Sequence, residues 1–200
     1  TRCKEKTMIA ICFNLTTDFA AAQRDTQCES YIERMASGDK AALSALYETT
    51  KSSVYGFALS LLKNPQDAED VLQDTYLQVY RGAKSYNPQG KPMAYIITVT
   101  RNLCLMKFRQ DKKTVDISED MWGTFFSENE NLSADDSIAL NGYMQALSQQ
   151  ERQIVTLYAV SGFKHREIAE ILNIPLSTVL SKYTRALKKL KKYYTEGENI

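Results

Sequence analysis

The sequence predicts an all-α protein made of two small helical domains joined by a flexible acidic linker. Glycine and proline are scarce, with 8 and 4 copies among 200 residues, so few turns are expected. Leucine, alanine, lysine, glutamate and glutamine, which favour helices, are abundant. Apolar residues recur at helical spacing in several long segments, whereas an acidic stretch near the middle lacks this periodicity.

The first long segment begins near Asp39 and ends before Pro65. Its apolar residues recur three, four and seven positions apart, as on one face of a helix. Asn64 is suited to cap a second helix, Pro65 to occupy its first position, and Asp67 to lie at its positively polarised end. We therefore predict two consecutive helices, the second ending near Gly82.

The segment SYNPQGKP, residues 85–92, contains two prolines and a glycine and predicts a loop. The following YIITVT, residues 95–100, is rich in β-branched residues and taken alone favours a strand. No partner strand is visible, and apolar residues continue at helical spacing into a basic end over residues 101–113. We predict a helix here, against the local strand preference.

An acidic segment separates the two halves of the chain. Residues 116–136 carry seven acidic side chains and no basic one. We predict a linker over residues 113–133, interrupted by the apolar MWGTFF. The expected domains are therefore residues 28–112 and 134–196, and residues 1–27 are expected to be a non-native or disordered N-terminal tail.

Composition excludes several classes of site. The four cysteines have no C-x-x-C spacing and His165 is the single histidine, so we expect no metal site, no cofactor and no disulfide framework. His165 is expected to pack or cap a helix. No apolar run approaches the roughly 18 to 20 residues of a membrane span, and a reducing cytoplasm fits the cysteine usage.

The C-terminal domain has the pattern of a helix-turn-helix. Ser148 and Glu151 form a capping box that opens one helix, which closes at Gly162. After it, a hydrophobic core pattern surrounds a turn in which Asn173 can take the left-handed position and Pro175 stops the helix. The core positions are Ile168, Ala169, Leu172, Ile174 and Val179.

The second motif helix is predicted to carry a DNA-binding face. Ser177 or Thr178 is expected to cap it, and Lys182 and Arg185 are placed to reach base edges or phosphates in the major groove. The full predicted set is Ser177, Thr178, Ser181, Lys182, Arg185, Lys188 and Lys189. Between residues 163 and 194 there are eight Lys or Arg against two Glu, which favours DNA over a merely solvated amphipathic hairpin.

The order of these segments resembles an extracytoplasmic function (ECF) sigma factor, of the sigma-70 family of bacterial RNA polymerase. The resemblance is carried by GDKAALSALY, NPQDAEDVLQDTYLQVYR, AYIITVTRNLCLMKFRQDKK and LSQQERQIVTLYAVSGFKHREIAEILNIPLSTVLSKYTRALKKL, and it covers about residues 28–194. It implies a region 2-like bundle in the first domain and a region 4-like helix-turn-helix in the second. Such a protein is not an enzyme and has no small-molecule substrate.

The resemblance assigns partners to the charged residues. Four of them are acids that taken alone would indicate a solvated face. With Gln73, they are expected to bind the β′ clamp helices of the polymerase core: Asp67, Glu69, Asp70, Gln73 and Asp74. The residues expected at the minus ten element of promoter DNA are Tyr95, Arg101, Asn102, Lys107 and Arg109. Tyr95 would stack at the melted edge, Asn102 would contact a base, and the cations would hold phosphates.

The resemblance further implies that the helix after Pro175 reads the minus thirty-five element and that an anti-sigma factor regulates the protein. The acidic linker would run through the nucleic acid channels of the polymerase. One position departs from the family pattern, since Leu180 stands where Lys or Arg is common. Recognition there is expected to depend more on DNA shape or on a different base sequence.

Three alternatives stay open at the level of sequence. The first is a stand-alone helix-turn-helix transcriptional regulator that binds its operator without polymerase. The second is an enzyme that uses SYNPQGKP for a phosphate substrate, although the loop lacks G-x-x-x-x-G-K-[ST]. The third is an adaptor that uses only the acidic helix.

Overall fold

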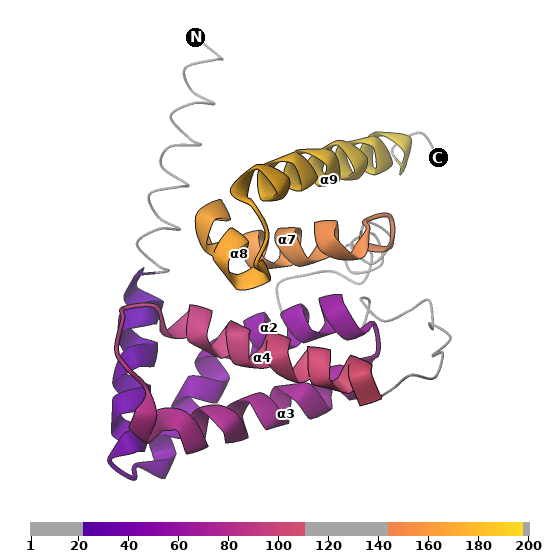
Figure 1. The fold of residues 1–200 in the computed structure, drawn as a ribbon. Helices are drawn as coiled ribbons and strands as arrows, with labels where there is room; N and C mark the ends of the chain where they lie inside the picture. The colour runs from indigo at the N-terminus through magenta and orange to yellow at the C-terminus, as the bar shows by residue number, and fades with distance from the viewer. Residues whose placement is uncertain (1–21, 111–143, 198–200) are drawn as a thin grey trace.

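The computed structural model of the chain describes residues 22–110 and 144–197, and every regular element within these two ranges is helical. The predicted all-α class is therefore confirmed. A first helix covers residues 22–36. It is followed by α2 (Lys40–Leu62), α3 (Pro65–Gly82), the 3₁₀ turn η1 (Ala83–Ser85), α4 (Pro92–Gln110), α7 (Gln149–Ala159), α8 (His165–Leu172) and α9 (Leu176–Gly197). Figure 1 shows α7, α8 and α9 stacked above α2, α3 and α4.

The helix boundaries follow local capping chemistry. The Asp39 carboxylate accepts a hydrogen bond from the Ala41 N–H at 2.9 Å and so caps α2. The helix ends at Lys63, which takes the left-handed conformation with φ 55°. The Asn64 side chain accepts the Gln66 N–H at 2.9 Å and opens α3 with Pro65 at its first position, as the sequence predicts.

Burial explains why YIITVT is helical. Ile96, Ile97 and Thr100 are all inaccessible to solvent and face α2 and α3. The Thr100 hydroxyl accepts a hydrogen bond from the Thr75 hydroxyl at 3.3 Å and donates to the Ile96 carbonyl at 2.9 Å. The helix buries these branched side chains without leaving a backbone edge unpaired, which a lone strand would do.

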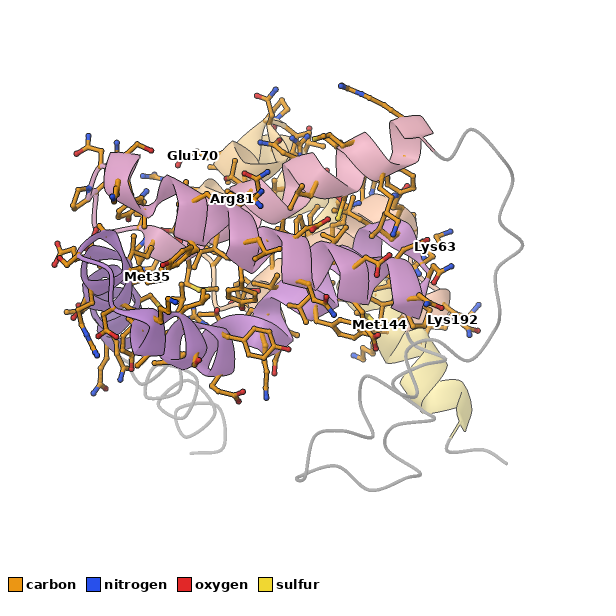
Figure 2. All side chains as sticks on the ribbon, turned by 90° about the horizontal axis from the view of Figure 1, so that it is seen from below. Met35, Lys63, Arg81, Met144, Glu170 and Lys192 are labelled. Atoms are coloured by element: carbon orange, nitrogen blue, oxygen red, sulfur yellow. The ribbon has the colours of Figure 1, made fainter. Side chains whose placement is uncertain are left out.

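The N-terminal bundle has a continuous apolar core with one polar link inside it. Figure 2 shows side chains filling the space between its helices, with Met35 on the first helix. The buried hydroxyls of Thr50 and Tyr76 are hydrogen-bonded at 2.7 Å, and burial raises the pKa of the Tyr76 phenol. This hydrogen bond links α2 to α3. It also satisfies two polar groups that would otherwise be buried without partners.

The helix over residues 22–36 precedes the first helix that the sequence predicts, near Asp39. Residues 22–27, which were assigned to the tail, form its opening turns, where Arg24 and Asp25 are half-buried and Arg24 donates to the Ser161 carbonyl. This contact spans 137 positions and was therefore invisible to local pattern analysis. Residues 1–21 and the predicted acidic linker at 113–133 lie outside the described residues.

The helix-turn-helix has the predicted turn but a different start to its second helix. Asn173 adopts the left-handed conformation with φ 54°, as expected. The prediction that Ser177 or Thr178 caps the next helix is wrong, because α9 begins at Leu176 and both lie in its first turn. The Pro175 carbonyl accepts the N–H groups of Thr178 and Val179, at 2.9 and 3.2 Å. A proline needs no N–H partner, so it can stand directly before the helix.

The predicted capping box at Ser148 and Glu151 is confirmed, and it has a further ion pair. Glu151 accepts from the Ser148 N–H at 2.9 Å, and its carboxylate, 5% exposed, lies 2.7 Å from the Lys189 ammonium of α9. Burial favours the protonated acid, but the hydrogen bonds with Lys189 and Ser148 outweigh it and lower the pKa of Glu151 to about 2.

This ion pair predicts that part of the free energy of unfolding is lost in acid. Because the pKa of Glu151 falls from 4.5 to about 2 on folding, its contribution is complete above pH 4.5 and is lost as the pH falls towards 2. Glu151→Gln keeps an acceptor for the capping box, so it isolates the charge. We expect it to lower the free energy of unfolding by about 2 kcal/mol at pH 7 and by less than half as much at pH 3. Urea unfolding followed by circular dichroism measures this difference, with Glu48→Gln as an exposed control; equal losses at both pH values would contradict the assignment.

Within the described ranges, no helix combines the length and the apolar character needed to cross a membrane.

Candidate nucleic-acid interface

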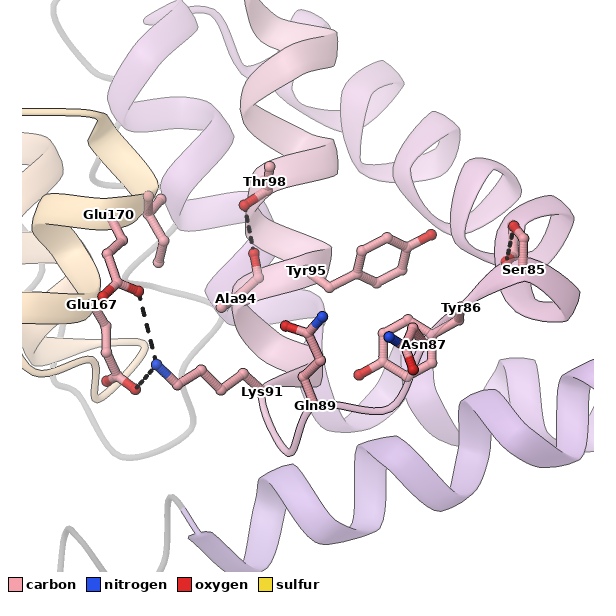
Figure 3. Close-up of a pocket in the computed structure, with 12 residues that line it drawn as sticks. Ser85, Tyr86, Asn87, Gln89, Lys91, Ala94, Tyr95, Thr98, Glu167 and Glu170 are labelled. Carbon is pink, nitrogen blue, oxygen red and sulfur yellow. Dashed lines mark hydrogen bonds and ion pairs between the residues drawn. The ribbon is translucent and has the colours of Figure 1, made fainter.

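A cavity of about 450 Å³ lies where the loop after η1 meets the start of α4. Figure 3 shows Tyr86 and Tyr95 on one side of it and the amides of Asn87 and Gln89 beside them. The two tyrosine rings are 5.0 Å apart with a tilt of 48°. Two aromatic faces beside amide groups can stack on a nucleobase and hydrogen-bond to its edge. Tyr95 was predicted for this role, whereas Tyr86 was not.

The loop is fixed by a residue that sequence reasoning missed. Glu29, on the helix over residues 22–36, accepts hydrogen bonds from the Tyr86 hydroxyl at 3.3 Å and the Gly90 N–H at 3.1 Å. Burial, followed by the Glu29 carboxylate, raises the pKa of the Tyr86 phenol, and burial raises that of Tyr95. Both phenols therefore stay neutral at physiological pH. Glu29 is 57 positions from Tyr86, so only the fold brings them together.

The other predicted minus ten residues point in three directions from α4. Asn102 and Arg109 are exposed, and they follow Tyr95 at intervals of seven, so the three share one stripe of the helix. Arg101 is half-buried and donates to the Leu172 carbonyl of α8 at 3.4 Å. Lys107 faces α3. The structure thus keeps Tyr95, Asn102 and Arg109 on one face and turns Arg101 and Lys107 away from it.

Lys107 is bound by two of the acids predicted to contact the polymerase. Its ammonium lies 2.7 Å from Asp67 and 2.9 Å from Asp70. Burial alone would lower the pKa of Lys107, but hydrogen bonds with both carboxylates outweigh it and raise the pKa. The pair joins α3 to α4, so Lys107 has a structural partner in addition to any phosphate.

The acidic face of α3 is otherwise open. Glu69, Gln73 and Asp74 are exposed, and the Asp70 side chain remains 61% exposed despite its pairing with Lys107. Leu77, which is 48% exposed, follows Asp70 and Asp74 at helical spacing. An exposed leucine among carboxylates suits a protein partner with a basic surface and an apolar pocket. Sequence reasoning missed Leu77, which the i, i+4, i+7 spacing with Asp70 and Asp74 could have revealed.

Helix α9 has a buried inward face and an exposed outward face. Val179 and Ala186 are fully buried, whereas Ser177, Ser181, Arg185 and Lys188 are exposed. Thr178 and Lys182 are half-buried at the edge of this outward face. We name the surface formed by these six residues the reading face. Lys189 is exposed but paired with Glu151. Leu180 and Leu187, each 46% exposed, form an apolar edge beside the basic residues.

His165 packs between aromatic rings, as predicted. Its imidazole stacks on Tyr158 at 4.8 Å and meets Tyr183 edge-on at 4.7 Å. Burial lowers the pKa of His165, so the ring is neutral at physiological pH. The three rings join α7, α8 and α9, which fixes the angle at which the reading face is presented.

The described residues hold no group of three or more histidine, cysteine, aspartate or glutamate side chains that could bind a metal ion. Cys28 and Cys104 are buried free thiols, and burial raises their pKa values to about 11 and about 12. They are therefore protonated at physiological pH and unreactive.

Comparisons with known proteins agree with the division into two helical halves. The family described as Sigma-70 region 2 matches residues 46–114, which include α3 and α4. The family described as Sigma-70, region 4 matches residues 138–190, which include the helix-turn-helix. The ECF RNA polymerase sigma factor SigM of Bacillus subtilis (strain 168) is 32% identical over 157 residues, covering 77% of this chain and 96% of SigM. The chain belongs to the ECF sigma factor family.

Other ECF sigma factors are similar over most of their length. SigK of Mycobacterium sp. (strain KMS) is 28% identical over 173 residues, covering 83% of this chain and 90% of that protein. Two solved structures share the fold. CnrH in complex with the cytosolic domain of CnrY has a TM-score of 0.61 at 18% identity, over 85% of this chain and 98% of that one. The sigma factor RpoE of Bartonella quintana, in complex with the anti-sigma factor NepR, has a TM-score of 0.59 at 22% identity, over 76% and 96%.

Proposed function

We propose that this ECF sigma factor binds the RNA polymerase core and places its two helical domains on two promoter elements, which directs initiation at those promoters. The observation that carries this proposal is the presence of three surfaces on one chain: the acidic face of α3, the aromatic cavity beside α4 and the reading face of α9. The protein acts by binding and supplies no catalytic group.

The acidic face of α3 is proposed to bind the β′ clamp helices of the core. The contact residues are Asp67, Glu69, Asp70, Gln73 and Asp74, with Leu77 as an apolar anchor. Opposite charges steer the two surfaces together, and burial of the leucine at one end of this face adds apolar area.

The cavity lined by Tyr86 and Tyr95 is proposed to hold a base unstacked from the minus ten element. Opening a duplex costs about 1.4 kcal/mol per base-pair step, and stacking on an aromatic ring returns about 1–3 kcal/mol per base. Asn102 is proposed to contact a base and Arg109 a phosphate. Arg101 and Lys107 can contribute only after leaving Leu172 and the α3 acids.

The reading face of α9 is proposed to enter the major groove of the minus thirty-five element. Arg185 and Lys188 are exposed for base or phosphate contacts, and Lys182 lies at the edge. Leu180 offers an apolar surface that suits a thymine methyl group better than a phosphate.

An anti-sigma factor is proposed as the regulator, and the cytoplasm as the compartment. The support is the fold shared with RpoE, which was solved with the anti-sigma factor NepR, and with CnrH, which was solved with the cytosolic domain of CnrY. A bacterial sigma factor must meet polymerase and chromosome in one compartment.

Transcription in vitro tests the proposed function. Purified chain and bacterial core polymerase are incubated with a library of upstream regions from the source genome, and transcripts are mapped. The proposal predicts discrete start sites that share two spaced sequence elements and that require the chain. No chain-dependent transcript from any region would overturn it.

The variant Gly82→Ala is expected to displace the Tyr95 side chain without destabilising the fold. A Cβ added at Gly82 would lie 2.7 Å from the Tyr95 hydroxyl oxygen, so the phenol must move while the α3 backbone need not. Gly82 is the last residue of α3, so alanine there should change helix stability by less than the about 1 kcal/mol of an interior position. We expect unchanged or slightly raised thermal stability together with about a tenfold loss of promoter opening, since stacking on one base is worth about 1–3 kcal/mol. Permanganate reactivity of minus ten thymines reports the opening, and normal reactivity in this variant would contradict the role of Tyr95.

A further inference from the structure

The loop over residues 86–91, which carries part of the proposed minus ten cavity, is held by one oxygen atom of a neighbouring helix. Glu29 Oε1 accepts a hydrogen bond from the Tyr86 hydroxyl at 3.3 Å and another from the Gly90 N–H at 3.1 Å. Hydrogen bonds to a carboxylate are stronger than those between neutral groups. A single side chain therefore holds the loop at two positions, one on each side of residues 87–89.

The short segment between these two positions carries polar side chains of the cavity. Asn87 and Gln89 line it beside the two tyrosine rings (Figure 3). Asn87, Pro88 and Gln89 are exposed, so packing does little to fix them. An amide side chain offers both a donor and an acceptor, so the base that it favours depends on where the backbone places it. The hydrogen bonds to Glu29 therefore act on the residues that would distinguish one base from another.

The backbone conformation of Gly90 explains why glycine stands at the second position. Its φ is 67°, in the left-handed region that L side chains rarely adopt. A Cβ added there would meet no neighbouring atom of the described residues, so conformation and not crowding favours glycine. In this conformation its N–H reaches the Glu29 carboxylate.

The helix that carries Glu29 is anchored in the core. Cys28 and Ile32, which flank Glu29 in the sequence, have fully buried side chains, and Glu29 itself is half-buried. The loop residues between the two held positions are exposed. Because the helix is packed and the loop is not, Glu29 fixes the position of the loop and not the reverse.

We infer that Glu29 is a positioning residue of the minus ten site, which sets the base preference by holding the loop in the geometry that presents Asn87 and Gln89 to a base. The inference rests on the proposed function for the DNA that the cavity receives, and on the contacts above for the positioning. Glu29 acts through the loop and contacts no base. Holding the loop before DNA arrives lowers the entropy cost of binding and keeps the amides from adapting to a wrong base.

The first measurement is amide hydrogen exchange in the free chain, followed by NMR. The Gly90 N–H should be protected in the wild type and exchange about tenfold faster in Glu29→Ala. It should stay largely protected in Glu29→Gln, which keeps an acceptor. Glu33→Ala, at an exposed position one turn further along the same helix, is the matched control and should leave Gly90 unchanged. Wild-type exchange at the rate of an unbonded amide would overturn the inference.

The second measurement is the base preference of the chain bound to core polymerase. Bases of a promoter found by transcription are replaced in turn in both elements, and affinities are compared. Glu29→Ala should lower the preference about tenfold at one or two minus ten positions and leave the minus thirty-five preferences unchanged, whereas Glu29→Gln should retain most of it. Tyr86→Phe keeps the ring but removes the hydroxyl donor, so it should give a smaller loss at the same positions. The double variant Glu29→Ala/Tyr86→Phe should lose less than the sum of the two free-energy changes, because both remove the same hydrogen bond.

A purely structural role of Glu29 predicts a different result, because a destabilised fold weakens binding at both elements and lowers the melting temperature. Equal losses at both elements, or an unchanged base preference in Glu29→Ala, would contradict the inference. A wild-type chain that gives no chain-dependent transcript would instead overturn the proposed function. The exchange of Gly90 is measured without polymerase, so it tests the positioning separately from that function.

Discussion

Replacing Asp70 and Asp74 by asparagine is expected to weaken binding to the RNA polymerase core by at least about tenfold. Both carboxylates lie on the open face of α3 beside Leu77, where they would meet a basic surface. The fold should survive, since Lys107 keeps its contact with Asp67 at 2.7 Å. Fluorescence anisotropy of labelled protein titrated with core measures the loss.

A matched control for this variant is Glu33→Gln/Glu48→Gln, which removes the same charge from two exposed positions outside α3. It should bind core as the wild type does. If the α3 variant also binds with wild-type affinity, the acidic face is a solvated surface and the polymerase must contact another part of the chain.

Replacing Arg185 by alanine is expected to weaken binding of the reconstituted polymerase to the minus thirty-five element by about five- to 150-fold. Arg185 is exposed on the reading face, with its guanidinium held by a hydrogen bond to the Ser181 carbonyl at 3.4 Å. A side chain that contacts a base edge contributes about 1–3 kcal/mol, which corresponds to this range. Lys182→Ala, at the edge of the face, should cost less.

The salt dependence of promoter binding distinguishes a base contact of Arg185 from a phosphate contact. If Arg185 contacts a base, its loss changes which base is preferred at one position, whereas loss of a phosphate contact weakens all sequences alike and lowers the salt slope by about 1. Lys40→Ala, an exposed lysine of the other domain, is the control. Promoter affinity unchanged by Arg185→Ala would exclude α9 as the reading helix.

Local chemistry was readable from the sequence where it depends on neighbouring residues. Asn64, Pro65 and the Ser148–Glu151 box mark helix starts because caps act over three positions. Asn173 marks the turn because few residues other than glycine tolerate a positive φ. The start of α9 was misplaced because the preference for hydroxyl caps was weighed above the stop at Pro175.

The sites were less predictable because their geometry comes from residues far apart in the chain. The sequence pattern assigns Lys107 and Lys189 to DNA, yet each is paired with an acid, Asp70 or Glu151, that lies 37 or 38 positions away. Arg101 contacts a carbonyl 71 positions away. A charge pattern gives the number of cations in a segment, but only the packing decides which of them are available to DNA.

Promoter binding with and without polymerase tests the central claim most directly. A promoter fragment identified by transcription is titrated with the free chain and with the chain bound to core, and permanganate reactivity is measured in both. The sigma factor account predicts weak binding by the free chain, and tight binding with reactive minus ten thymines only when core is present. Tight binding by the free chain that core does not change would contradict it and would indicate a stand-alone regulator.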